Sequence, residues 1–100
     1  MAAPQKRVAR VEEMMCIVDI IKYHFALRGV STMFLVKLTE FIHGANHTYI
    51  MSKDEILRLI ERLAEFCPEW IKIVDNEAGR LVKINKEIPI FNVFKQLKAL

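Results

Sequence analysis

The chain has 100 residues, of which 53% are apolar and 27% are charged, and its formal net charge is +3. This balance is typical of one compact globular domain and excludes a disordered chain. No apolar run approaches the roughly 18 to 20 residues that span a bilayer, and the first ten residues lack the apolar core of a secretory signal, so we expect an intracellular protein without a membrane segment.

The first predicted helix covers Val8 to Leu27, because apolar side chains recur there at helical spacing. Its main stripe consists of Val11, Met14, Met15, Val18, Ile21 and Phe25. A second, partial stripe consists of Ile17, Ile20, His24 and Leu27. The apolar sector is therefore wider than one face, which predicts that the helix is central or also presents a surface to a partner. Arg28 and Gly29 supply its C-terminal charge and stop signal.

The next segment is predicted to contain a short extended piece and a second helix. Val30 and Ser31 form the extended piece, and either Ser31 or Thr32 is expected to cap the helix. The inner face of this helix is expected to carry Phe34, Leu35, Leu38, Phe41 and Ile42. The helix is predicted to end at Gly44, and a connector follows it.

The third predicted helix covers Lys53 to Phe66 and has the clearest start signal in the chain. Ser52 and Glu55 have the spacing of a capping box, in which each side chain bonds to the backbone N–H of the other residue. The inner stripe is Ile56, Leu59, Ile60, Leu63 and Phe66. Pro68 is expected to stop the helix, because proline cannot continue its hydrogen bonds.

The last third of the chain predicts a hairpin and a final helix. Trp70 to Val74 and Leu81 to Ile84 are rich in aromatic and β-branched residues, and DNEAG between them supplies a turn. Pro89 suits the first turn of a last helix, IPIFNVFKQLKAL, whose Ile90, Phe94 and Leu97 share a face. The predicted class is α+β and mainly helical: a single winged-helix domain over residues 1–100, a helix-turn-helix variant with a two- to three-stranded wing and a C-terminal helix.

The residue types that carry chemistry do not assemble into a catalytic or metal-binding pattern. His43 and His47 are four residues apart, but Gly44 and Asn46 intervene and no further ligand is near, so a solvated loop is expected. His24 is interpreted as a partly buried, hydrogen-bonded histidine. Cys16 and Cys67 lie in apolar helical patterns and are expected to be free, buried thiols. We therefore predict no enzyme, no cofactor and no metal site.

Two binding functions remain, DNA reading and protein binding, and the charges favour the second. The third helix has three cations and four carboxylates, and Asp54 and Glu55 occupy its first turn, where a DNA-reading helix approaches base edges. The wing tip carries Asp75 and Glu77, whereas a minor-groove wing needs a cation there. The alternative is a DNA-binding winged helix that uses the basic termini, because the first ten residues have a net charge of +3 and the last fifteen a net +2.

The segment MSKDEILRLIERLAEFCPEWIKI, with LVKINK after the turn, resembles the C-terminal winged-helix domain of the eukaryotic replication licensing factor that loads the MCM helicase, the Cdt family. The matching features are a Met-Ser helix start, a capping Glu, a Pro-acidic-Trp-aliphatic helix end and a second strand of Val-Lys-aliphatic-Asn-Lys. They are Met51, Ser52, Glu55, Pro68, Glu69, Trp70, Ile71, Val82, Lys83, Asn85 and Lys86. The match is specific for about a third of the chain.

The resemblance implies a non-enzymatic, nuclear module of a larger protein. Such a module binds MCM helicase subunits, contacts the origin recognition complex indirectly and acts in the pre-replicative complex. The family is part of the cell cycle. DNA binding is expected to be weak or absent, and the isolated domain to be monomeric. Homodimerisation through the broad first helix is the further alternative.

Two groups of cations are the expected partner-binding residues. The first group, within the resembling stretch, is Lys53, Arg58 and Arg62, and the second, at the start of the first helix, is Lys6, Arg7 and Arg10. A helix of mixed charge is suited to complementary contacts with a protein. Trp70 is expected to close the core between the third helix and the hairpin, with a surface hot spot as the alternative.

Overall fold

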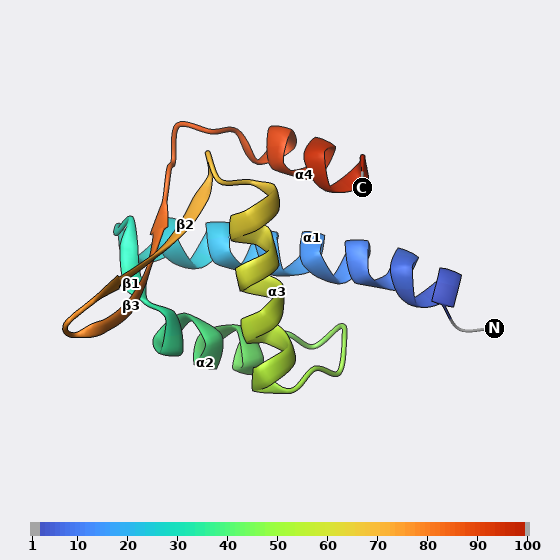
Figure 1. The fold of residues 1–100 in the computed structure, drawn as a ribbon, viewed down its shortest axis with the longest axis horizontal. Coiled ribbons are helices and arrows are strands. Elements are labelled where there is room, and N and C mark those ends of the chain that lie inside the picture. The colour runs from blue at the N-terminus through green and yellow to red at the C-terminus, as the bar shows by residue number, and fades with distance from the viewer. Residues whose placement is uncertain (1–2, 100) are drawn as a thin grey trace.

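The computed structural model describes the backbone of residues 3–99 and the side chains of residues 11–99. Its elements are, in chain order, α1 (Ala3–Arg28), β1 (Thr32–Phe34), α2 (Leu35–Ala45), α3 (Lys53–Phe66), β2 (Ile71–Asn76), β3 (Gly79–Ile84) and α4 (Ile90–Lys98) (Figure 1). This is the predicted order of helix, short strand, helix, helix, hairpin and helix. The mainly helical α+β class and the winged-helix-like fold are confirmed.

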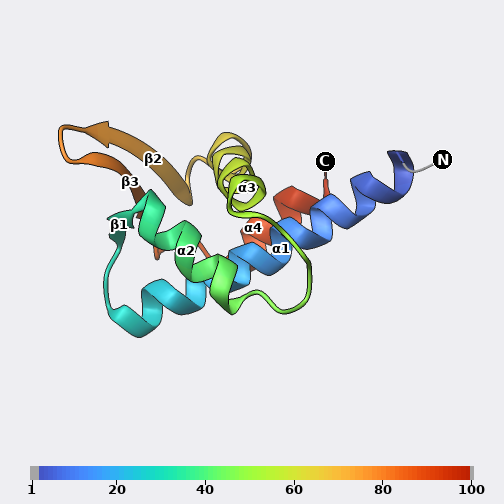
Figure 2. The ribbon, with the colours of Figure 1, turned by 90° about the horizontal axis from the view of Figure 1, so that it is seen from below.

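Helix α1 runs along the long axis of the molecule, and α2 and α4 both pack against it (Figures 1 and 2). It begins at Ala3 rather than at the predicted Val8. Gly29 ends it with a φ of +66°, which a residue without Cβ adopts readily. The wide apolar sector has a structural explanation, because Ile17, Ile21 and His24 are all buried between the neighbouring elements.

The three strands form one antiparallel sheet in the order β1-β3-β2. The central strand β3 pairs with β2 from Ile71↔Ile84 to Asn76↔Gly79, and with β1 through Thr32↔Lys83, Met33↔Val82 and Phe34↔Leu81. The third strand of the predicted wing therefore exists, and it begins at Thr32, directly after the expected extended piece of Val30 and Ser31. The hairpin projects at the end of the molecule away from the N-terminus (Figures 1 and 2).

The start of α2 differs from the prediction that Ser31 or Thr32 would cap it. The N-cap is Phe34, which has extended backbone angles and no side-chain cap hydrogen bond. Thr32 belongs to β1, and the Ser31 carbonyl accepts a hydrogen bond from the Ile84 N–H at 2.9 Å. Pairing with β3 therefore occupies these residues, and the strand runs directly into the helix. At its other end α2 continues to Ala45, one residue past Gly44.

Helix α3 has the predicted bounds and the predicted capping box. The Glu55 N–H donates to Ser52 Oγ at 3.1 Å, and the Ser52 N–H donates to Glu55 Oε1 at 2.9 Å. These two bonds satisfy backbone donors that a helix start otherwise leaves unpaired. In Figure 1, α3 crosses in front of α1 and brings its first turns close to α2. Its outer face is therefore fixed relative to both the helices and the sheet.

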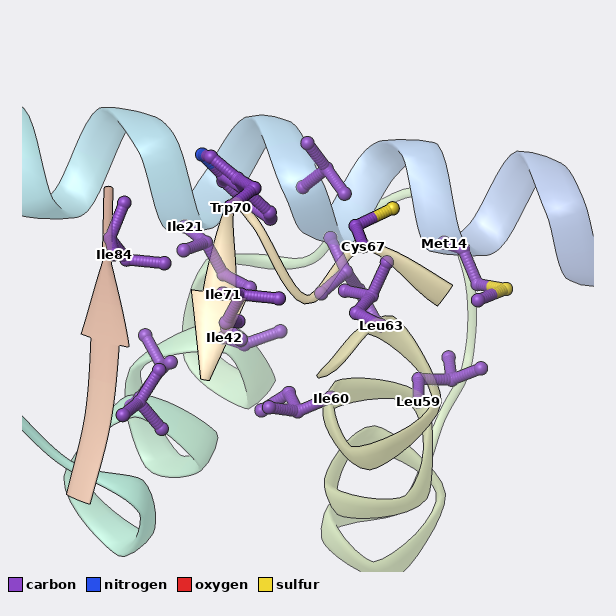
Figure 3. Packing of buried hydrophobic residues seen from close by; sticks show 14 of the residues in the cluster. Met14, Ile21, Ile42, Leu59, Ile60, Leu63, Cys67, Trp70, Ile71 and Ile84 are labelled. Carbon is purple, nitrogen blue, oxygen red and sulfur yellow. The ribbon is translucent and has the colours of Figure 1, made fainter. Parts of the chain in front are cut away.

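The core lies between α1, α3, the inner face of the sheet and the other two helices (Figure 3). Four of the five predicted stripe residues of α3 are fully buried, and only Phe66 is half-buried. On α4 the buried residues are Val93 and Leu97, while Ile90 and Phe94 pack at the edge of the core. Trp70 is 2% exposed and packs in this cluster, as predicted for a core role.

Candidate protein-binding surface

The first group of predicted partner-binding cations lies on the exposed side of α3, but on two different faces. Arg58 and Arg62 are one helical turn apart and therefore adjacent. Lys53 precedes Arg58 by five residues, which places it about 140° around the helix. All three side chains are exposed. The structure therefore brings two of the three together and separates Lys53 from them.

These cations have no carboxylate partner among the side chains of residues 11–99. Asp54 and Arg58 have i, i+4 spacing but form no ion pair, and neither Lys53 nor Arg62 makes one in the described part of the chain. An exposed cation without an intramolecular partner keeps its full charge available to an acidic surface. The pair of Arg58 and Arg62 is the clearest such feature on α3.

The wing is tied to α3 by one arginine on its returning strand. The Arg80 guanidinium donates from Nε to Asp75 Oδ1 at 3.0 Å and from Nη1 to Glu61 Oε2 at 2.9 Å. Asp75 and Arg80 are directly opposite each other across β2 and β3. Exposed pairs of this kind contribute little stability. Their consequence is orientation, because Arg80 directs its guanidinium toward Asp75 and toward Glu61 of α3, and it does not point away from the wing tip.

The turn of the wing is a short polar loop held by one asparagine. Asn76 Oδ1 accepts hydrogen bonds from the N–H groups of Ala78 at 2.8 Å and Gly79 at 3.1 Å. Gly79 has a φ of +135°, a conformation that favours glycine. Asp75 and Glu77 are exposed beside this loop. The tip therefore carries the acidic character predicted for it and lacks the outward cation that a minor-groove wing needs.

An open groove separates the outer side of α3 from β2. It has a volume of about 570 Å³ and is lined by Glu61, Ala64, Glu65, Lys72, Ile73, Val74 and Arg80. The lining mixes both signs of charge with aliphatic carbon. Such a surface can bind a protein segment through complementary charges and apolar contact. The link between Glu61 and Arg80, 19 residues apart, was not predictable from the sequence.

The second group of predicted cations lies in the first turns of α1. Lys6, Arg7 and Arg10 belong to the helix backbone, but their side chains lie outside the described residues. Their proposed role therefore remains a prediction.

Helix α1 also has an exposed apolar side near its C-terminus. Tyr23 is 66% exposed and Leu27 68% exposed. Tyr23 also lines an open groove of about 580 Å³ between α1 and α2, together with Asp19, Ile20, Lys22, Ala26, Phe41 and Ala45. The use of the broad helix as a surface for a partner or a second copy stays a prediction, and these exposed residues are the ones that it would involve.

The histidines and cysteines are distributed over α1, α2, the connector after α2 and the end of α3. Within the described residues no three His, Cys, Asp or Glu side chains lie close enough to hold a metal ion. His43 is the exposed last-turn residue of α2 and not a loop residue, and His47 is exposed in the connector. Cys67 is buried, whereas Cys16 is only half-buried, which corrects the expectation for that thiol. Burial raises the pKa of both thiols, so they stay protonated at neutral pH.

His24 is buried, as predicted, but the expected hydrogen bond is not present at Nδ1. Its ring stacks on Phe41 with 3.6 Å between the centroids, and Nδ1 has no hydrogen-bond partner. The predicted hydrogen bond was therefore wrong at this atom. Burial lowers the pKa of His24 below its usual value, and the nearby Arg28 cation lowers it further.

The lowered pKa of His24 predicts that acidification destabilises the domain. The unfolded chain takes up the proton at its usual pKa of about 6.5, whereas the folded chain resists it, so stability falls as the pH drops below that value toward the folded pKa. Urea unfolding between pH 7.5 and pH 5 measures this fall. His24→Phe should reduce the pH dependence, and the exposed His43→Gln variant should retain it. Equal pH profiles for wild type and His24→Phe would contradict the assignment.

No helix in the described residues is long and apolar enough to cross a membrane.

The family model of the DNA replication factor Cdt1 C-terminal domain matches residues 1–77. The match covers α1, β1, α2, α3 and β2 and ends at the wing tip, so the resembling residues Val82, Lys83, Asn85 and Lys86 lie beyond it. No curated protein matches the chain.

Proposed function

The chain belongs to the family of DNA replication factor Cdt1 C-terminal domains, and from this membership we propose that it is a protein-binding module that binds MCM helicase subunits and supports helicase loading at replication origins. The family implies a role in DNA replication licensing and protein partners in that process. A replication factor acts on chromosomal DNA, so the location that follows is nuclear. Residues 1–100 would act as one domain within a larger protein, without catalysis of their own.

The observation that carries this proposal is the arrangement of charge on α3 and the wing. Arg58 and Arg62 lie together on an exposed face, and their side chains form no ion pair among the described residues. Asp54, Glu61 and Glu65 lie on the same helix, so the surface as a whole is mixed in sign. Mixed surfaces select a partner by complementary charge, whereas phosphate backbones need a cluster of one sign.

The wing geometry supports a protein partner over DNA. Arg80 hydrogen-bonds to Glu61 and Asp75, and Asp75 and Glu77 stand beside the turn. A wing that enters the minor groove would bring these carboxylates to the phosphates. The proposed partner-binding residues are Arg58 and Arg62 on one face of α3, Lys53 on another, and Lys6, Arg7 and Arg10 at the start of α1.

The test is direct capture of purified MCM subunits on the immobilised domain at physiological salt. We expect at least one subunit to be retained and its binding to weaken as the salt concentration rises, because complementary charges are screened. A parallel mobility shift with duplex DNA should give only weak binding, with a dissociation constant above about 1 μM. Retention of no subunit together with tight, sequence-dependent DNA binding would replace the proposal with the DNA-reading alternative.

A further inference from the structure

The outer face of the three-stranded sheet carries an ordered pattern that the fold itself does not require. The register places Phe34, Leu81 and Val74 opposite one another, across β1, β3 and β2. The next row on the same face is Thr32, Lys83 and Lys72. Residues of the alternate rows, such as Val82 and Ile71, point inward and are buried. We call the five residues Phe34, Val74, Leu81, Lys72 and Lys83 the outer sheet patch.

The apolar row of the outer sheet patch is open to solvent. Phe34 is 43% exposed and Val74 is 36% exposed, and Leu81 between them is half-buried. The Phe34 ring lies over Gly79, where a Cβ would be 3.9 Å from it. Three strands thus contribute one aromatic and two aliphatic side chains to a continuous apolar strip. Strips of this kind mark interaction sites when charged residues border them.

The charged row of the outer sheet patch is unfavourable for the isolated domain. Lys72 and Lys83 are directly opposite each other on neighbouring strands, and like charges in that position destabilise a sheet. Both side chains are exposed, and neither forms an ion pair among residues 11–99. Glu69 borders the hollow beside them, together with Pro68, Trp70, Ile84 and Asn85, but it does not pair with either lysine. An external carboxylate between the two lysines would relieve the repulsion.

We propose that the outer sheet patch binds a second protein partner, a segment in which aliphatic side chains are flanked by carboxylates. The aliphatic groups cover the row of Phe34, Leu81 and Val74, and the carboxylates lie between Lys72 and Lys83. This surface is on the opposite face of the sheet from the row that contains Arg80, and it includes none of the α3 cations, although Lys72 and Val74 on β2 also border the groove beside α3. The inference therefore does not rest on the proposed function.

The apolar strip decides between a protein and a nucleic acid as the occupant. Two lysines alone would suit a phosphate backbone, but a phosphate backbone has nothing to cover an aromatic and two aliphatic side chains. A single base could stack on Phe34, yet Val74 and Leu81 would stay exposed. An acidic and aliphatic protein segment satisfies both rows at once.

The experiment uses a displayed library of random 12-residue peptides and selects those that bind the whole domain. Peptides that also bind the double variant Lys72→Glu, Lys83→Glu are removed. The peptides that survive should be rich in Glu or Asp together with Leu, Ile or Val. In amide NMR spectra they should shift residues of β1 to β3 most strongly. Their affinity should fall at least ten-fold in Lys83→Glu, because a carboxylate then faces a carboxylate.

A stability measurement distinguishes lost binding from lost folding. Lys83→Glu places opposite charges across β2 and β3, so its Tm should rise by about 1 to 5 °C while binding falls. The matched control is Lys95→Glu on α4, an exposed cation far from the sheet, which should bind the peptides as wild type does. Enrichment of no acidic and aliphatic sequence, peptide shifts on α1 or α3 instead, or DNA binding that Lys83→Glu abolishes would overturn the proposal.

Discussion

Replacing Trp70 by alanine is expected to lower the free energy of unfolding by about 3 to 5 kcal/mol. The indole is 2% exposed and packs at the start of β2, where the sheet meets α1 (Figure 3). Its backbone also joins the two strands to the preceding turn, since its carbonyl accepts from the Asn85 N–H at 2.8 Å and its N–H donates to the Cys67 carbonyl at 3.0 Å. Truncation would leave a cavity that these constrained neighbours fill only in part.

Urea unfolding followed by far-UV circular dichroism measures this loss, because Trp70 is the one tryptophan and its fluorescence disappears with it. Phe91→Ala is the matched control, since that aromatic ring is 68% exposed and its removal should change stability by less than about 0.5 kcal/mol. A domain of this size has roughly 5 to 15 kcal/mol of stability, so the variant should remain foldable but marginal. A loss below 1 kcal/mol for Trp70→Ala would contradict its core role.

Reversing Arg58 and Arg62 together to glutamate should weaken the capture of MCM subunits at least ten-fold. The two side chains share one exposed face of α3. Like charges brought together in an interface cost several kcal/mol of binding free energy, and each 1.4 kcal/mol lowers the affinity ten-fold. The thermal transition should stay nearly unchanged, because these side chains make no ion pair among residues 11–99 and point away from the buried stripe. Capture by affinity chromatography and thermal melting provide the two readouts.

Single variants separate the faces of α3. Lys53→Glu alone should have a smaller effect, because that residue lies about 140° around the helix from Arg58. The matched control is the pair Lys95→Glu and Lys98→Glu on α4, which reverses two exposed charges on another element. Unchanged capture by the Arg58 and Arg62 variant would remove this face from the interface, and loss of capture by the α4 variant would move the interface there.

Local signals in the sequence predicted the helices well because their determinants are a few residues apart. The bounds of α3 follow from Ser52 and Glu55 at one end and Pro68 beyond the other, together with a stripe of i, i+3 and i+4 spacing. The predicted start of α2 was wrong. Ser31 and Thr32 are residue types that cap helices, but here they pair with β3, about 50 residues later in the chain. The hydrogen bond predicted for His24 is absent at Nδ1 for a related reason, since the partners available to a buried side chain depend on the fold and not on local spacing.

The candidate surfaces were less accessible to sequence reasoning than the fold. The prediction from the sequence placed Lys53, Arg58 and Arg62 in one group, although helical geometry separates Lys53 from the other two. Their role in binding stays a prediction. The outer sheet patch depends on the register of three strands. A shift of β2 by one residue would have placed Lys72 on the inner face of the sheet. Contacts between distant segments, such as that of Arg80 with Glu61, have no signal in local spacing.

The strand order has a consequence for the order in which the parts of the domain fold during synthesis. β3 is the central strand, yet it is the last of the three along the chain, so β1 and β2 have no neighbour in the sheet until residues 79–84 exist. Strands without a neighbour leave their backbone groups unpaired. A nascent chain that extends only to residue 77 therefore contains β1 and β2 without their pairing partner. The sheet forms only after β3 has left the ribosome.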